Sequence, residues 1–242
     1  MNSRGSIRLT RRSRGLWSPL NDRGRNQIDY RDFRDIGGLL ERSQRYKWIY
    51  TGTEFCENLM DLYLNIDRAL LNFREKSLCF LTPILTDKSF KKLDRIVNKL
   101  IKIKARDIEI TVNDFGALYF LKNKYPELKI NIGRHLSKHF FSFRKDAIKL
   151  STDFSVYGVK YLGTSGIERY EISPYDLLPE TNFKKFKRLN FKLTMFYPYR
   201  LLSTTRTCLI GLNDIPPEID MRHINCRKEC LYCDYLAKTD RV

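Results

Sequence analysis

Three cysteines near the carboxyl end of the chain, within the segment CRKECLYC, are the residues best suited to chemistry. Cys226 and Cys230 are four positions apart, so that on a helical turn both thiols would face the same way. Cys230 and Cys233 form a CxxC pair, which can also chelate a metal ion. Cys208 precedes them on a separate segment, and Cys56 lies far away along the chain. These residues predict a cysteine-lined metal site.

The spacing of the cysteines fits two kinds of metal site equally well. A 4Fe–4S cluster needs four thiolates, and its ligands can lie far apart in the sequence. Zinc also accepts four cysteines, although its structural sites more often use two close pairs. A redox-active CxxC at Cys230 and Cys233 is a third interpretation, but this pair lacks the strand-to-helix setting expected of such a motif. The spacing alone therefore supports a zinc site and an iron–sulfur site equally.

The compartment of the protein decides how its six cysteines are interpreted. The beginning of the chain, MNSRGSIRLTRRSRG, is polar and basic, unlike a signal peptide, and no apolar run approaches the length of a membrane span. We therefore expect a cytoplasmic protein without a membrane span, in which cysteines serve metal binding or redox chemistry instead of disulfides. Cys79 differs, because it lies in the apolar run SLCFLTPIL and is predicted to be a small buried core residue.

The chain is strongly basic. Its 242 residues include 45 Lys and Arg against 28 Asp and Glu, a formal net charge of +17. Such an excess attracts polyanions, so RNA or an acidic small molecule is a candidate partner. No long unbroken basic tract occurs, however, and a Lys-rich solvated surface explains the charge equally well. Residues 1–26 are rich in Arg, Ser and Gly and are predicted to be a basic flexible arm.

Segments with the patterns of strands and helices alternate through residues 27–242, which we expect to form a single domain. The predicted strands are rich in β-branched or aromatic residues and end at Gly, Pro, Asn or Asp; they cover 46–52, 77–85, 107–114, 128–134, 168–173 and 191–199. The predicted helices have apolar residues at helical spacing, and they cover 57–73, 88–103, 115–125 and, as a short helix–turn connection, 153–163.

This alternation predicts an α/β fold with parallel strands and helices outside. An incomplete or compact (β/α) barrel with a cysteine-rich carboxyl-terminal segment fits better than a doubly wound sheet. The reason is that no glycine-rich phosphate-binding pattern follows an early strand. In barrels the chemistry gathers at the carboxyl ends of the strands. Cys56, Asn113, Asp114 and Arg134 all follow or end predicted strands, and they are expected to converge on one face.

Several of these polar residues have two interpretations each. Arg134 can clamp a carboxylate of a substrate or form a surface ion pair. Asn113 and Asp114 can face the substrate or cap the helix that follows. His135 and His139 have the i, i+4 spacing of metal ligands, but no acidic third ligand is nearby in the sequence. A solvent-facing helix start is the expectation for them.

Five collinear stretches resemble a known family. They are IYTGTEFC (49–56), ITVNDFGAL (110–118), NIGRHLSK (131–138), YPYRLLSTTRTC (197–208) and CRKEC (226–230). The chain resembles the collagenase-like U-thirty-two peptidase family, and within it the iron–sulfur branch that includes the anaerobic ubiquinone-biosynthesis hydroxylation proteins. The resemblance covers residues 49 to 233 in the order of the family.

The resemblance implies a (β/α) barrel-like fold that carries a 4Fe–4S cluster on Cys56, Cys208, Cys226 and Cys230. Cys233 is then the alternative to Cys230. Members of this branch act in oxygen-independent hydroxylation of tRNA, rRNA or a ubiquinone precursor, with prephenate as the suspected oxygen donor. The ubiquinone proteins work as a heterodimer, so a related partner subunit is expected. The basic arm replaces the first strand and helix of the family, so the barrel is expected to lack a piece.

Two other functions are considered beside the iron–sulfur interpretation. The net charge and the basic arm favour a non-catalytic RNA-binding module with structural zinc. Peptidase activity, which the family name suggests, comes last. The sequence contains no HExxH, GxSxG or P-loop pattern, and it shows no nucleophile beside a base.

Overall fold

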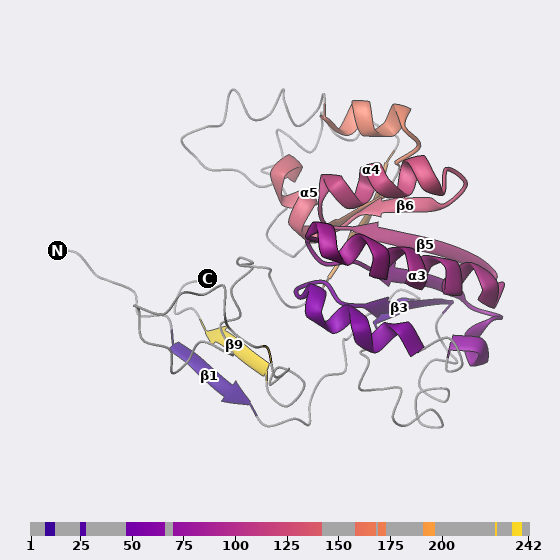
Figure 1. Ribbon diagram of the computed structural model, residues 1–242. Coiled ribbons are helices and arrows are strands. Elements are labelled where there is room, and N and C mark those ends of the chain that lie inside the picture. Colours follow the sequence, from indigo (N-terminus) through magenta and orange to yellow (C-terminus); the bar gives the residue numbers. More distant parts are fainter. Residues whose placement is uncertain are drawn as a thin grey trace. The chain divides into compact units, whose positions relative to one another are not determined.

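The computed structural model describes residues 8–12, 25–27, 47–65, 70–141, 158–167, 169–172, 191–196, 226 and 234–238. The chain forms two compact units, one of residues 1–18 and 205–242 and the other of residues 19–204. In the smaller unit, β1 (Arg8–Arg12) pairs antiparallel with β9 (Asp234–Lys238), as Figure 1 shows. β1 lies within the segment expected to be an arm, and the division of the chain at residue 26 stays a prediction.

The larger unit is built on a parallel sheet of seven strands that follow one another in chain order. Each strand pairs with its predecessor, so the sheet has no point at which the strand order reverses, unlike a doubly wound sheet. The α/β class and the parallel strands are therefore confirmed. The strands are β2 (Arg25–Gln27), β3 (Trp48–Gly52), β4 (Ser77–Leu81), β5 (Asp107–Val112), β6 (Lys129–Ile132), β7 (Arg169–Ile172) and β8 (Lys192–Met195).

Helices connect these strands on the outer side of the sheet (Figure 1). This placement follows from right-handed crossovers, which put every connection on the same face when strands are added in one direction. The connections are η2 (Glu57–Asn65), η3 (Leu71–Phe73), α3 (Asp87–Ile103), α4 (Phe115–Lys124), α5 (Arg134–Phe141) and a helical segment at 158–164. In the predicted helix 57–73, residues 57–65 and 71–73 form 3-10 turns. Asn and Asp recur in this segment, and their side chains compete with α-helical hydrogen bonding.

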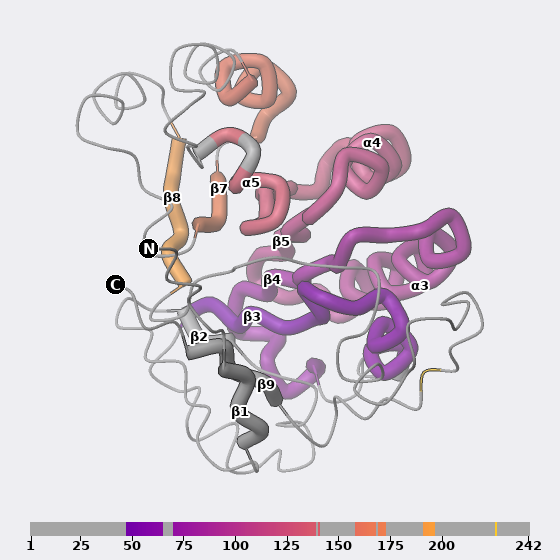
Figure 2. The backbone as a smooth tube through the Cα atoms, turned by 90° about the vertical axis from the view of Figure 1, so that its left-hand side faces the viewer, coloured from indigo at the N-terminus to yellow at the C-terminus, as the bar shows by residue number. Residues whose placement is uncertain are grey.

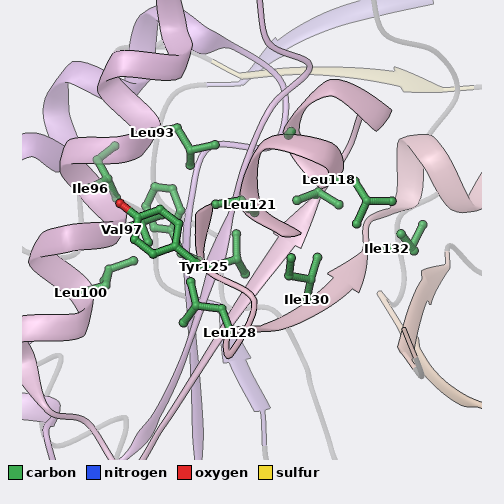
Figure 3. Packing of buried hydrophobic residues seen from close by; sticks show 14 of the residues in the cluster. Leu93, Ile96, Val97, Leu100, Leu118, Leu121, Tyr125, Leu128, Ile130 and Ile132 are labelled. Atoms are coloured by element: carbon green, nitrogen blue, oxygen red, sulfur yellow. The ribbon is translucent and has the colours of Figure 1, made fainter. Parts of the chain in front are cut away.

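Helix α3 shows why these residues form an amphipathic helix. Most of its apolar residues recur at helical spacing and are buried, whereas exposed Lys and Arg lie on the opposite face. Leu93, Ile96, Val97 and Leu100 pack toward α4 and the residues after it in the core shown in Figure 3. Burial of each such side chain contributes about 1.5–3 kcal/mol. The helix ends at Lys104, whose φ of 53° is left-handed.

Contacts between strands far apart in the sheet show that the sheet curls. The rings of Tyr50 on β3 and Phe196 after β8 are 6.1 Å apart between centroids. In a flat sheet, five strand spacings of about 4.8 Å would separate β3 from β8 by about 24 Å. Arg169 on β7 likewise lies 5.9 Å from the ring of Trp48 on β3. The sheet is therefore a curled half-barrel, whose strands follow one another along an arc in Figure 2.

Candidate functional site

A buried ion pair spans the carboxyl ends of β3 and β6. Arg134, the first residue of α5, donates from Nε to Oε1 of Glu54 at 2.8 Å and from Nη2 to Oε2 of the same carboxylate. Glu54 is 4% exposed and Arg134 is 8% exposed. Two strands lie between β3 and β6 in the sheet, so the pair crosses the mouth of the half-barrel and depends on its curl.

Aromatic rings enclose the guanidinium of Arg134. Its central carbon lies 4.5 Å from the centroid of Phe196 and 5.9 Å from that of Phe55. A guanidinium over an aromatic face gains cation–π stabilisation, most of all where water is excluded. The surface ion pair considered for Arg134 is thus a buried one, and the carboxylate that it binds is Glu54. A role of Arg134 toward a substrate stays a prediction.

Asn113 ties three strand ends together. Its Nδ2 donates to the carbonyl of Thr82 at 2.7 Å, and its Oδ1 accepts from the backbone N–H of His135 at 3.1 Å. Gly133 allows this close packing, since a Cβ there would lie 2.2 Å from Asn113 Oδ1. The side chain is 3% exposed and links the ends of β4, β5 and β6. Asn113 therefore holds together the carboxyl-terminal ends of these strands, which form the rim of the half-barrel.

Asp114 caps helix α4. Its Oδ1 accepts from the backbone N–H of Ala117 at 2.7 Å, and its Oδ2 accepts from the backbone N–H of Leu85 at 3.0 Å. The first bond gives a partner to one of the first-turn N–H groups, which have none within the helix, and the second fixes the loop after β4. The prediction that Asp114 caps the following helix is confirmed.

His135 is buried against the same rim, so the expectation that it faces solvent is wrong. It is 7% exposed, and its ring meets Phe55 edge-on with centroids 5.5 Å apart. Burial lowers the pKa of His135 below its ordinary value of 6.5, although the charge of Glu54 works in the opposite direction. Glu54 thus places an acidic group near His135 in space, although the two residues are distant in the sequence. The side chain of His139 lies outside the described residues.

Cys56 lies two residues beyond Glu54, on the loop that leaves β3. Its side chain is partly exposed, and its carbonyl accepts from Thr53 Oγ1 at 2.9 Å and from the Leu59 N–H at 3.3 Å. Partial exposure at the carboxyl end of a parallel strand fits a metal ligand. The role of Cys56 as a metal ligand stays a prediction.

The other cysteines differ in position and in what the structure describes. Cys79 is 0% exposed with Sγ 3.2 Å from Thr111 Oγ1, which confirms it as a buried core residue. Cys226 is partly exposed and belongs to the smaller unit. Cys208, Cys230 and Cys233 lie outside the described residues. Among the residues that are described, no three His, Cys, Asp or Glu side chains are grouped to hold a metal ion, and the ligand set stays a prediction.

The concave face of the sheet holds a polar network that the sequence patterns left unnoticed. Thr111 Oγ1 donates to Glu171 Oε1 at 2.8 Å, and Asn131 Nδ2 donates to Glu109 Oε2 at 2.8 Å. Both glutamates are buried, and Arg169 lies 3.7 Å from Glu109. The signal for this network is the alternation in DIEITV, where Glu109 and Thr111 alternate with Ile108, Ile110 and Val112, because alternate residues of a strand point to opposite faces of the sheet.

Comparisons with known proteins leave the family of this chain open. No protein-family model matches the chain, and no curated protein matches its sequence. The resemblance to the U-thirty-two family therefore depends on the five collinear motifs. Over the described residues, the structure contains no helix that is both long and apolar enough to cross a membrane.

Proposed function

We propose that the chain is an iron–sulfur protein of an oxygen-independent hydroxylation or related modification system, as the resemblance implies. Its 4Fe–4S cluster would be held by Cys56, Cys208, Cys226 and Cys230, with Cys233 as the alternative to Cys230. The bound cluster would supply one-electron chemistry. The proposal includes a (β/α) barrel-like fold, a cytoplasmic location and a related partner subunit.

The position of Cys56 is the observation that carries this proposal. The residue follows β3 at the carboxyl-terminal rim of the parallel half-barrel, where barrel proteins bind their ligands. Cys79 lies on the next strand but is sealed inside the sheet, so only Cys56 of these two has the exposure of a ligand. The charged pair of Glu54 and Arg134 adjoins Cys56 on the same rim.

The substrate proposed for this rim carries a carboxylate or phosphate group, because the net charge of the chain is +17. The guanidinium of Arg134 is already bound by Glu54, so Arg134 would bind such a group only in place of Glu54. Asn113 and Asp114 already bond to backbone groups, so their contribution to substrate binding would be to hold the rim in shape. The substrate itself is proposed only by this chemical class.

Metal analysis of anaerobically purified protein tests the proposal. We expect brown, air-sensitive protein with about four irons and about four sulfides per chain. Cys230→Ser and Cys233→Ser variants then identify the fourth ligand, because only the true ligand should lower the iron content. Colourless protein with stoichiometric zinc, or protein without bound metal after cluster reconstitution, would contradict the proposal.

A second candidate, an RNA-binding module with structural zinc, is favoured by the outer face of α3. Lys88, Lys91, Arg95 and Lys102 are all exposed on this one helix. Retention on RNA that falls steeply with salt would support this candidate. Reversal of charge at Lys91 and Arg95 should then weaken retention, whereas unchanged retention would exclude this face.

A further inference from the structure

We infer that the ion pair of Glu54 and Arg134 positions Cys56, so that a residue of α5 sets the geometry of a ligand on the β3 loop. This inference rests on the proposed function. It assigns Glu54, Arg134 and Thr53 as positioning residues, not as ligands. Their effect would pass through the short loop of residues 53–56.

The loop is anchored at its start by the backbone of the sheet. Gly52 has a φ of 125°, and a Cβ there would lie 2.3 Å from the carbonyl oxygen of Leu81. The N–H of Thr53 donates to that same carbonyl at 3.0 Å, and Tyr63 Oη donates to the carbonyl of Gly52 at 2.7 Å. Only glycine fits this left-handed, crowded position. The direction in which the loop leaves β3 is therefore determined.

Side chains fasten the rest of the loop. Thr53 Oγ1 donates to the carbonyl of Cys56, which closes the loop on itself at 2.9 Å. Glu54, next along the chain, is held at both carboxylate oxygens by Arg134. Phe55 packs its ring against His135 at 5.5 Å between centroids. Each residue before Cys56 in this loop thus has its own contact.

The long-range partner is itself held rigidly. Arg134 begins α5 directly after Gly133, whose N–H donates to the carbonyl of Val112 at 2.7 Å. Asn113 accepts from the N–H of His135, and Phe196 covers the guanidinium of Arg134. A guanidinium that is fixed in this way presents a planar fork that an ammonium cannot reproduce. Replacement of the guanidinium should therefore break the paired hydrogen bonds to Glu54 and leave the loop less constrained there.

Thiol alkylation of the reduced, metal-free full chain tests the inference without depending on a cluster. Rates at Cys56 and Cys226 are measured by peptide mass spectrometry, with Cys226 as the internal reference. Arg134→Lys and Glu54→Gln should raise the rate at Cys56 severalfold, and the double variant should add little because the two residues act as one pair. Arg106→Lys, at an exposed position just before β5, should leave the rate unchanged.

A second pair of variants covers the case in which the buried ion pair is needed for folding. Thr53→Val removes the bond to the Cys56 carbonyl with little change in volume, and it should also raise the rate at Cys56. Thr51→Val is its matched control, because Thr51 Oγ1 is buried and has no hydrogen-bond partner among the residues that the structure describes. An unchanged rate at Cys56 in folded Arg134→Lys and Thr53→Val would overturn the inference. An equal rise at Cys226 would overturn it too, because it would show general loosening.

The holoprotein separates this inference from the proposed function. In anaerobic protein, folded Arg134→Lys should lose iron and change the electron paramagnetic resonance spectrum of the reduced cluster, whereas Arg106→Lys should do neither. If the wild-type protein binds no iron but Cys56 is alkylated faster in Arg134→Lys, the cluster is refuted while the positioning role of the ion pair stands. If the wild-type protein binds iron, and Arg134→Lys changes neither the alkylation rate at Cys56 nor the electron paramagnetic resonance spectrum, only the positioning role is refuted.

Discussion

At the scale of single residues, buried polar side chains hold the rim of the half-barrel in place. Glu54 and Arg134 neutralise each other, Asn113 bonds to two strand ends, and Asp114 caps a helix. A buried polar group is costly unless it is bonded, so such residues constrain the structure to one arrangement. The loss of one partner from a buried ion pair typically costs about 3–5 kcal/mol.

The pH dependence of stability should report on His135. Burial lowers the pKa of this side chain in the folded protein, so the unfolded chain takes up a proton there that the folded chain does not. The free energy of unfolding should therefore fall as the pH drops below about 6.5, with a contribution of at most about 1.4 kcal/mol per pH unit. His135→Gln should flatten this dependence in urea denaturation measured from pH 7 to pH 5. An unaltered slope in the variant would show that His135 does not titrate in this way.

Two glycines provide a matched test of the rim. Gly133→Ala would force a Cβ into the side chain of Asn113 and should lower the free energy of unfolding by about 1–3 kcal/mol. A Cβ at Gly163, in the helical segment 158–164, would have no described atom within 4 Å. Gly163→Ala should therefore raise the free energy of unfolding by about 0.4–1 kcal/mol. Chemical denaturation of both variants checks these signs. A Gly133→Ala variant as stable as the wild type would contradict the close packing at Asn113.

At the scale of elements, hydrophobic patterns account for most of what was predicted correctly. The strand runs and the α3 pattern predicted elements at the right positions, because alternation and helical spacing are local properties. The local signal failed for His135, because its polar character suggested solvent, whereas α5 buries it against Phe55 of the loop after β3. The partners of Arg134 and Glu109 could not be predicted, because they lie 80 and 22 positions away in the sequence.

Helix α3 gives the element-scale prediction. Leu93 is 0% exposed in the core beneath the helix, so Leu93→Ala should lower the free energy of unfolding by about 2–5 kcal/mol. Ile101 lies on the exposed side of the same helix, and Ile101→Ala should change it by about 0.5 kcal/mol or less. Denaturant titration compares the two variants. Equal losses would mean that α3 packs on the sheet by a different face.

At the scale of the whole molecule, the chain combines a curled parallel sheet with a smaller unit that carries four of the six cysteines. The alternation of strand and helix patterns and the absence of a phosphate-binding glycine pattern were sufficient to predict an α/β fold of barrel-like type from the sequence. The degree of curl was not predictable, because it is set by contacts such as Tyr50 with Phe196 between strands far apart in the sheet. The choice between zinc and iron–sulfur depends on thiol geometry, which cysteine spacing alone does not specify.

The central claim, that Cys56 is a ligand of an iron–sulfur cluster, is tested most directly by the iron content of two serine variants purified anaerobically. Cys79→Ser changes a thiol buried in the sheet, and Cys56→Ser changes the thiol on the rim. We predict about four irons per chain in the wild type and in Cys79→Ser, and loss of most of this iron in Cys56→Ser. A folded Cys56→Ser variant that keeps the iron content of the wild type would contradict the claim.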